Sequence, residues 1–175
     1  MSLSSLARRA LGRSPLRRCA AVGVRVRVEG DVTLVAPDRI FLGDDVVLDG
    51  RRAPIELNAG PGGSIHVGAG AHLAGGVSIE AAERVEIGAN ARLEGNVKVM
   101  DSPFHSVTGD RHRRPAPVPV HVGDDAVVGW RSVLLPGARL GRRVTVLPNT
   151  VVSRAVPDDA TVFGSPMRVR PAGAR

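Results

Sequence analysis

The segment VGDDAVVGWRSVLLPGARLGRRVTVLPNTVV, residues 122–152, decides the fold of this chain. Aliphatic residues occupy every sixth position in it: Val122, Val128, Leu134, Leu140, Val146 and Val152. Gly follows several of them, as at Gly123, Gly129 and Gly141. An amphipathic helix would repeat at about 3.6 residues and a plain strand at about 2. A period of six predicts a short strand followed by a tight corner, repeated along the chain.

The same period runs upstream with short interruptions. Its aliphatic positions are Leu42 and Leu48, then Val67, Leu73 and Ile79, then Ile87, Leu93 and Val99, with Val28 and Leu34 in the first coil. In hexapeptide solenoids three such units close one triangular coil of about eighteen residues. Gly, Asn and Asp tolerate the positive φ angles of the corners. We therefore expect an all-β chain coiled as a parallel β-helix, and the regular spacing disfavours a β-sandwich.

The composition supports a narrow aliphatic interior and excludes several classes of protein. Hydrophobic residues make up 43% of the chain, yet aromatic residues make up only 2%. The net charge is +7, but no reading helix or aromatic cluster is visible, so we expect no nucleic-acid partner. The single Cys19 excludes an intrachain disulfide framework and fits a reducing cytoplasm. No apolar run reaches the length of a membrane span.

The extent of the repeat divides the chain into three expected parts. Residues 1–22 form a basic extension or cap, residues 23–157 the β-helix, and residues 158–175 a tail that packs back along the last coil. The extension carries Arg8, Arg9, Arg13, Arg17 and Arg18 among apolar residues. A flexible basic tail is one interpretation of it. A short amphipathic helix with weak contact to an anionic membrane surface is the other.

One insert breaks the repeat, and we expect it to carry the function. The loop 100–121 is polar, basic and Pro-rich, so it cannot continue the coil and should project from it. Long loops on rigid scaffolds are common positions for binding and catalytic residues.

The residues 122–141, 150–157 and 163–168, together with Asp101-Ser-Pro-Phe-His105, resemble the hexapeptide-repeat acyltransferases. The similarity is strongest to the branch of sugar and polysaccharide O-acetyltransferases, and it covers about residues 23 to 170. This resemblance implies a left-handed β-helix, whereas general chain chirality alone would favour right-handed crossovers. It also implies a homotrimer in which acyl-CoA lies between neighbouring prisms.

The resemblance assigns His105 as a general base. A neutral imidazole can deprotonate an attacking hydroxyl near physiological pH. The expected reaction moves an acetyl or other acyl group from acyl-CoA to a hydroxyl of a sugar, polysaccharide unit or small metabolite. By analogy, backbone N–H groups around Gly129 and Trp130 would stabilise the oxyanion. Asn96 and Asp101 are either acceptor contacts or corner residues, and both interpretations stay open.

The resemblance also places a CoA site near the end of the chain. Arg168 corresponds to a basic residue near the CoA phosphates, and Ser153 and Arg154 match another contacting pair; guanidinium groups suit phosphate. Two positions depart from the pattern, because Trp130 and Pro148 stand where the family has small residues.

Two alternatives to acyl transfer remain. The departures at Trp130 and Pro148 favour a non-catalytic β-helix that serves as a scaffold or a subunit of an assembly. A metal-dependent protein of the gamma carbonic anhydrase type needs a His-x4-His pair. No two His here are five residues apart, so no metal is expected. His66 and His72 are six apart, and we expect them to stack on one face.

Overall fold

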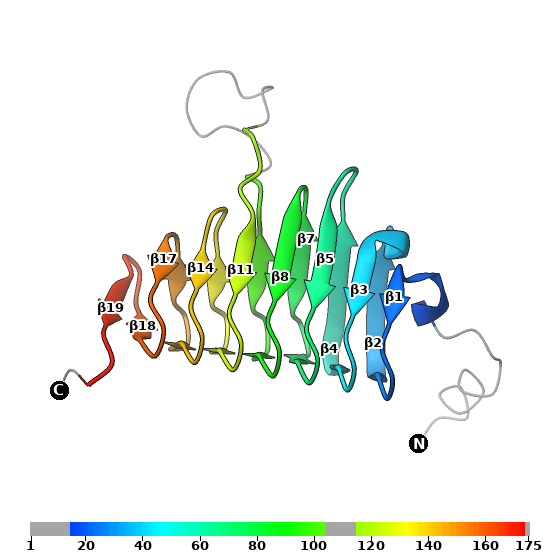
Figure 1. Ribbon diagram of the computed structural model, residues 1–175, viewed down its shortest axis with the longest axis horizontal. Coiled ribbons are helices and arrows are strands. Elements are labelled where there is room, and N and C mark those ends of the chain that lie inside the picture. The colour runs from blue at the N-terminus through cyan, green and yellow to red at the C-terminus, as the bar shows by residue number, and fades with distance from the viewer. Residues whose placement is uncertain (1–14, 104–114, 174–175) are drawn as a thin grey trace.

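The computed structural model describes residues 15–103 and 115–173. The chain forms a left-handed parallel β-helix, in which strands from successive coils lie side by side along one axis (Figure 1). The predicted fold class is confirmed.

The strands form two sheets, which make the three faces of a triangular prism. The first face holds β1 (Ala21–Val22), β3 (Ile40–Leu42), β5 (Ser64–Val67), β8 (Arg84–Ile87), β11 (Val120–Val122), β14 (Arg139–Leu140) and β17 (Ala155–Val156). Two long strands, β2 (Arg27–Val35) and β4 (Val47–Ala59), cross from the second face to the third. The second face continues with β6 (His72–Ala74), β9 (Arg92–Leu93), β12 (Val127–Val128), β15 (Thr145–Val146) and β18 (Thr161–Phe163). The third face continues with β7 (Ser78–Ala81), β10 (Lys98–Met100), β13 (Val133–Leu134) and β16 (Val151–Val152).

We name the corners by the faces they join. The first corner joins the first and second faces, the second corner joins the second and third, and the third corner joins the third face to the first face of the next coil. These names are kept below.

The six-residue aliphatic positions form the core. Val122 pairs with Leu140, and Leu134 with Val152, so equivalent positions stack eighteen residues apart. All six aliphatic residues of the 122–152 segment are at most 1% exposed. The upstream positions from Leu42 to Val99 are buried as well, at no more than 3% exposed. The interior therefore consists of aliphatic columns, as the low aromatic content predicts.

Most corners contain one residue in the left-handed backbone region. Asp45, Asn90, Asn96, Asp125 and Asn149 have φ between 55° and 59°. These residue types adopt that region at low cost. Arg25, Arg131 and Arg143 also adopt it, which the sequence did not indicate.

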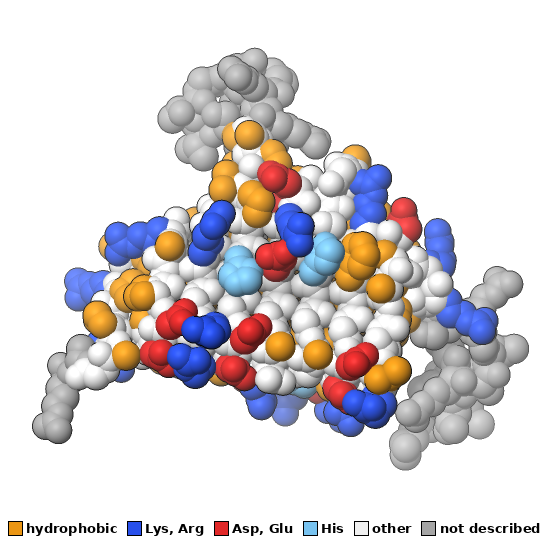
Figure 2. All heavy atoms as spheres, viewed as in Figure 1, with side chains coloured by type: hydrophobic (Ala, Val, Ile, Leu, Met, Phe, Trp, Pro, Cys, Tyr) orange, Lys and Arg blue, Asp and Glu red, His pale blue; other side chains and the backbone are white. Residues whose placement is uncertain are grey.

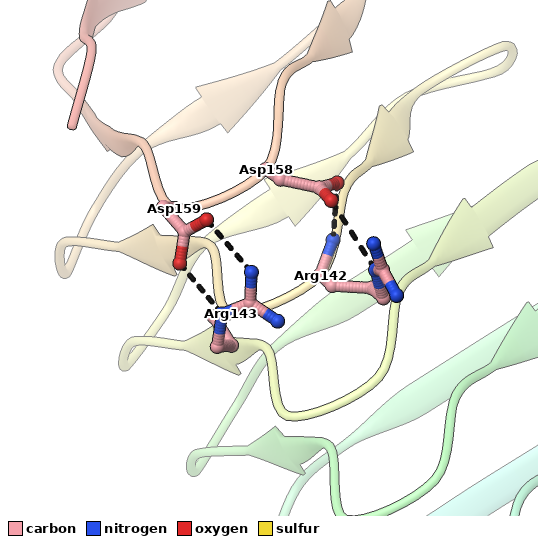
Figure 3. A network of polar contacts seen from close by, with 4 residues as sticks. All are labelled: Arg142, Arg143, Asp158 and Asp159. Carbon is pink, nitrogen blue, oxygen red and sulfur yellow. Dashed lines mark hydrogen bonds and ion pairs between the residues drawn. The ribbon is translucent and has the colours of Figure 1, made fainter.

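Carboxylates tie neighbouring coils together along the first corner (Figure 3). Asp158 accepts hydrogen bonds from the backbone N–H and the Nε of Arg142, at 2.9 and 3.2 Å. Asp159 accepts two from the guanidinium of Arg143, at 2.6 and 2.7 Å. The same pattern links Arg25 to Asp45 near the other end of the prism. The first corner is thus a structural ladder of polar contacts.

Both ends of the prism are covered by non-coil segments. The 3-10 helix η1 (Pro15–Arg18) places Leu16 against the core, where it is 8% exposed. The 3-10 helix η2 (Pro37–Arg39) lies between β2 and β3. At the other end, β19 (Arg168–Arg170) pairs antiparallel with β18. Because β18 is still in register with β15, the coil runs to Phe163, beyond the boundary expected at residue 157. Likewise β1 lies within residues 1–22.

The insert leaves the prism at the third corner. β10 ends at Met100 and β11 begins at Val120, so the insert is residues 101–119. Its described ends, up to Pro103 and from Pro115, rise away from the coils (Figure 1). Across the described ranges 15–103 and 115–173, no helix combines the length and hydropathy that crossing a membrane requires.

Candidate functional site

Asp101 fixes the base of the insert. Its carboxylate is fully buried and accepts hydrogen bonds from the backbone N–H groups of Ala82, Glu83 and Arg84, each at 2.7 Å. Its carbonyl oxygen accepts the N–H of Val118 at 2.7 Å, which joins the two ends of the insert. Asp101 is therefore a corner residue with both carboxylate oxygens engaged, and in this conformation it cannot contact an acceptor.

The proposed base belongs to the part of the insert between Pro103 and Pro115. His105 and His112 lie outside the described residues. The descending end of the insert is held at Val118, whose carbonyl accepts the N–H of Gly137 at 2.9 Å.

Trp130 occupies the second corner and lies on the preceding coil. A Cβ placed on Gly95 would come within 2.7 Å of the ring carbon Cζ3 of Trp130 and 2.9 Å of Cη2. The indole ring therefore covers Gly95, and it remains 42% exposed. Leu147, one coil further on, is 41% exposed at the same corner, next to Pro148. This part of the corner is an open apolar surface.

The two backbone donors expected for an oxyanion differ in availability. The N–H of Gly129 donates to the carbonyl oxygen of Val146 at 2.8 Å as part of the coil ladder. The N–H of Trp130 has no acceptor within the described parts of the chain. Only the Trp130 N–H is therefore free to stabilise an anion at this corner.

Asn96 lies at the same corner, one coil before Trp130. Its backbone is left-handed, with φ 59°, and its side-chain oxygen lies over Gly76 of the coil before it. The residue is exposed, so it acts as a corner residue and still faces solvent.

Two hydroxyls at the second corner were not singled out by the sequence. Ser132 and Thr150 are fully buried, and both donate to the carbonyl oxygen of Leu147, at 3.1 and 2.6 Å. Thr150 also accepts the N–H of Gly164 at 3.2 Å. The sequence contained one signal for them: they are polar residues at a repeat position that Val97 occupies in the preceding coil. They fix the backbone path beside Trp130.

Gly129 and Trp130, at the second corner, were expected to contact CoA, and the three other residues expected to bind it lie at the C-terminal end. Arg168 is exposed and opposes Phe163 across the β18–β19 pair, beside the second corner. Ser153 and Arg154 are exposed at the third corner, where the N–H of Ser153 approaches Sδ of Met167 at 3.4 Å. Neither Arg154 nor Arg168 forms an ion pair with another described residue. Both guanidinium groups are thus available to an anion.

Comparison with known proteins identifies the repeat. The family described as the hexapeptide repeat of succinyl-transferase matches residues 119–154. An N-acyltransferase of Bacillus cereus, solved with dTDP-4-amino-4,6-dideoxyglucose and coenzyme A, superposes with a TM-score of 0.75 over 100% of this chain and 90% of that one, at 18% identity. The chain therefore has the fold of this N-acyltransferase, and its residues 119–154 are similar to the hexapeptide repeat.

Further similar proteins are acetyltransferases. A hexapeptide-repeat acetyltransferase of Vibrio cholerae, solved with acetyl coenzyme A, has a TM-score of 0.66 at 20% identity, over 98% of this chain and 79% of that one. A galactoside O-acetyltransferase of Lactococcus lactis is 25% identical over 119 residues, 67% of this chain and 56% of its own length. A tetrahydropyridine-dicarboxylate N-acetyltransferase of Staphylococcus aureus is 36% identical over 55 residues, 31% of this chain and 23% of its own length. The chain thus spans about half or less of the curated relatives it matches.

The first face carries a separate cluster of ionisable side chains, visible as histidines beside acidic and basic groups in Figure 2. The rings of His66 and Phe41 stack with centroids 4.4 Å apart. Burial lowers the pKa of His66 below its ordinary value. Burial opposes ionisation of Glu86, yet hydrogen bonds from His121 and Arg84 hold the pKa of Glu86 below its ordinary value. These side chains satisfy one another and border a shallow groove.

The expectation that His66 and His72 stack on one face is wrong. His66 lies on β5 of the first face and His72 on β6 of the second. A step of six residues moves the chain to the next face, and only a step of about eighteen returns it to the same column. Within residues 15–103 and 115–173, no three His, Cys, Asp or Glu side chains are grouped as metal ligands.

Proposed function

We propose that this protein is an acyltransferase that moves an acetyl or other acyl group from acyl-CoA to a hydroxyl of a sugar, polysaccharide unit or small metabolite. The supporting observation is the second corner, where the Trp130 N–H has no acceptor among the described residues, and beside which lies Arg168, which forms no ion pair with them. Along the prism axis, Trp130 and Arg168 are three strand spacings apart: from the Trp130 coil to the Pro148 coil, then to β18, and then to β19. At the usual spacing of neighbouring strands this distance is about 14 Å. An extended pantetheine arm fits between a phosphate at Arg168 and a thioester at Trp130.

In this proposal His105 removes the proton of the acceptor hydroxyl as its oxygen attacks the thioester carbonyl carbon. The carbonyl oxygen becomes an oxyanion, which accepts a hydrogen bond from the Trp130 N–H. The tetrahedral intermediate then collapses, the carbon–sulfur bond breaks, and His105 returns the proton to the sulfur of CoA. Asn96 is kept as an acceptor contact because it is exposed on the same corner as Trp130. Gly129 contributes through its missing side chain, since a Cβ there would meet the Leu147–Pro148 backbone.

The dimensions of the prism favour a homotrimer. The insert leaves one edge of the third face, and Trp130 lies at the other edge. Trp130 precedes Leu135, at the third corner, by five residues, so the third face is about 17 Å wide. The third face therefore separates the described ends of the insert from the second corner of the same subunit, and we propose that a neighbouring subunit supplies the corner that completes the site. Sedimentation that gives the mass of one 18.3 kDa chain would remove this part of the proposal.

The experiment that tests the function measures thiol release from acetyl-CoA with a panel of sugar and small hydroxyl acceptors. We expect His105→Ala to lose at least about a hundredfold in kcat, the usual contribution of a general base. His112→Ala is the matched control, because it removes an imidazole from the same insert. Equal activity of the two variants would remove His105 from the mechanism.

The alternative, a non-catalytic β-helix, is favoured by one observation. The Trp130 ring fills the corner over Gly95, where a ligand would otherwise lie. This alternative predicts no binding of CoA by calorimetry, whereas micromolar binding contradicts it.

A further inference from the structure

Trp130 is the only large side chain in its column of the second corner. The equivalent position is Gly75 in the third coil, Gly95 in the fourth and Pro148 in the sixth. The backbone bonds confirm this column, because the N–H of Arg131 donates to the carbonyl oxygen of Gly95 at 3.0 Å and that of Asn149 to Trp130 at 2.8 Å. The two preceding positions of this column, Gly95 and Gly75, therefore have no side chain, and the Trp130 ring covers Gly95.

The ring points away from Arg168. A Cβ added to Gly95, on the N-terminal side, would meet the ring carbons Cζ3, Cη2 and Cε3 first, whereas Arg168 lies beyond β18 on the C-terminal side. An acyl donor whose phosphates contact Arg168 reaches Trp130 with its thioester. Any further acyl carbons would continue towards Gly95 and Gly75, onto the surface that the ring occupies.

We propose that Trp130 limits the acyl donor to short-chain acyl-CoA thioesters of the acetyl class. This inference rests on the proposed function, because it takes its direction from the CoA site at Arg168. The indole lies against the backbone of Gly95 with no room for a methyl group between them. A longer chain must therefore displace the ring from Gly95 and lose that contact. An acetyl group ends before the ring and leaves the contact intact.

The test compares the affinities of acetyl-CoA, butyryl-CoA and octanoyl-CoA by calorimetry, without an acceptor so that no turnover occurs. We expect the unmodified protein to bind octanoyl-CoA at least about tenfold more weakly than acetyl-CoA. Trp130→Gly reproduces the residue found at Gly95 and Gly75, and it should reverse this order, since the longer chain then lies on open corner surface. Trp130→Ala serves the same purpose if the glycine variant does not fold, as judged by thermal melting.

Leu147→Ala is the matched control. Leu147 is as exposed as Trp130 and lies at the same corner, but on the side of Trp130 away from Gly95. Its removal should leave the order of the three affinities unchanged. If Trp130→Gly binds CoA thioesters in the same order as the unmodified protein, the inference is overturned while the proposed function stands. If neither protein binds any of the thioesters, the proposed function fails and the inference fails with it.

Discussion

Single residues at the corners determine whether the insert and the candidate site hold their shape. The sequence left Asp101 with two interpretations, because a carboxylate before a loop looks the same whether it binds a ligand or caps a turn. The structure distinguishes them, since only the folded coil brings the N–H groups of residues 82–84 around that carboxylate. These three donors come from the coil before, seventeen to nineteen residues away, so no local pattern could reveal them.

Asp101→Ala should destabilise the protein by about 3 kcal/mol, because it leaves three backbone donors without their acceptor. Urea denaturation measures the free energy of unfolding directly. Asp31→Ala removes an exposed carboxylate from the first coil, and it should change that free energy by less than about 0.5 kcal/mol. A loss at Asp101 no larger than the loss at Asp31 would contradict the structural role.

Trp130 differs from Asp101, because the sequence predicted its position in the coil but not the direction of its ring. The repeat predicted that this residue lies at a corner, and the structure places it at the second corner. The direction of the ring could not be predicted, because it depends on the absence of a side chain at Gly95 in the neighbouring coil.

At the level of the elements, the strands were predictable and the corners only partly so. The inward positions followed from a single period, because each strand contributes one buried aliphatic residue to a column. Asn and Asp at left-handed corners followed from their intrinsic tolerance of positive φ. Arg25 and Arg143 did not, because their conformation is supported by Asp45 and Asp159 in the next coil.

The carboxylates that pair with arginine should make stability depend on acid pH. Hydrogen bonds from Arg51, Arg25 and Arg143 hold the pKa values of Asp49, Asp45 and Asp159 below the ordinary value, and that of Asp49 falls to about 2. A folded-state pKa below the unfolded one means that the unfolded chain binds protons first. The stabilisation is thus complete above the ordinary Asp pKa of about 3.9 and is lost as the pH falls towards 2.

Melting temperatures between pH 7 and pH 2 measure this dependence. Asp159→Asn should show a smaller decrease over the acid range than the unmodified protein, because one of the shifted groups is gone. Asp31→Asn, an exposed carboxylate outside the pairs, should follow the unmodified protein. An unchanged acid decrease in Asp159→Asn would show that its pair with Arg143 does not stabilise the folded state.

For the whole molecule, one period predicted the coil, and the break in that period located the insert. The period did not predict where the coil ends, because β18 closes a coil of sixteen residues rather than eighteen between Val146 and Val162. The tail then reverses as β19 and brings Arg168 beside the second corner. In the proposed function, residues from the insert, the second corner and the tail act together along the prism.

The most direct test of the central claim is the fluorescence of Trp130 during a titration with coenzyme A. The chain has one Trp and no Tyr, so its intrinsic emission reports on the second corner alone. If CoA lies along this corner from Arg168 to Trp130, the emission must change saturably in the micromolar range. Arg168→Ala should then weaken the binding by about tenfold or more, as expected when a guanidinium–phosphate contact is removed. CoA binding that calorimetry detects while the emission of Trp130 stays constant would contradict the account.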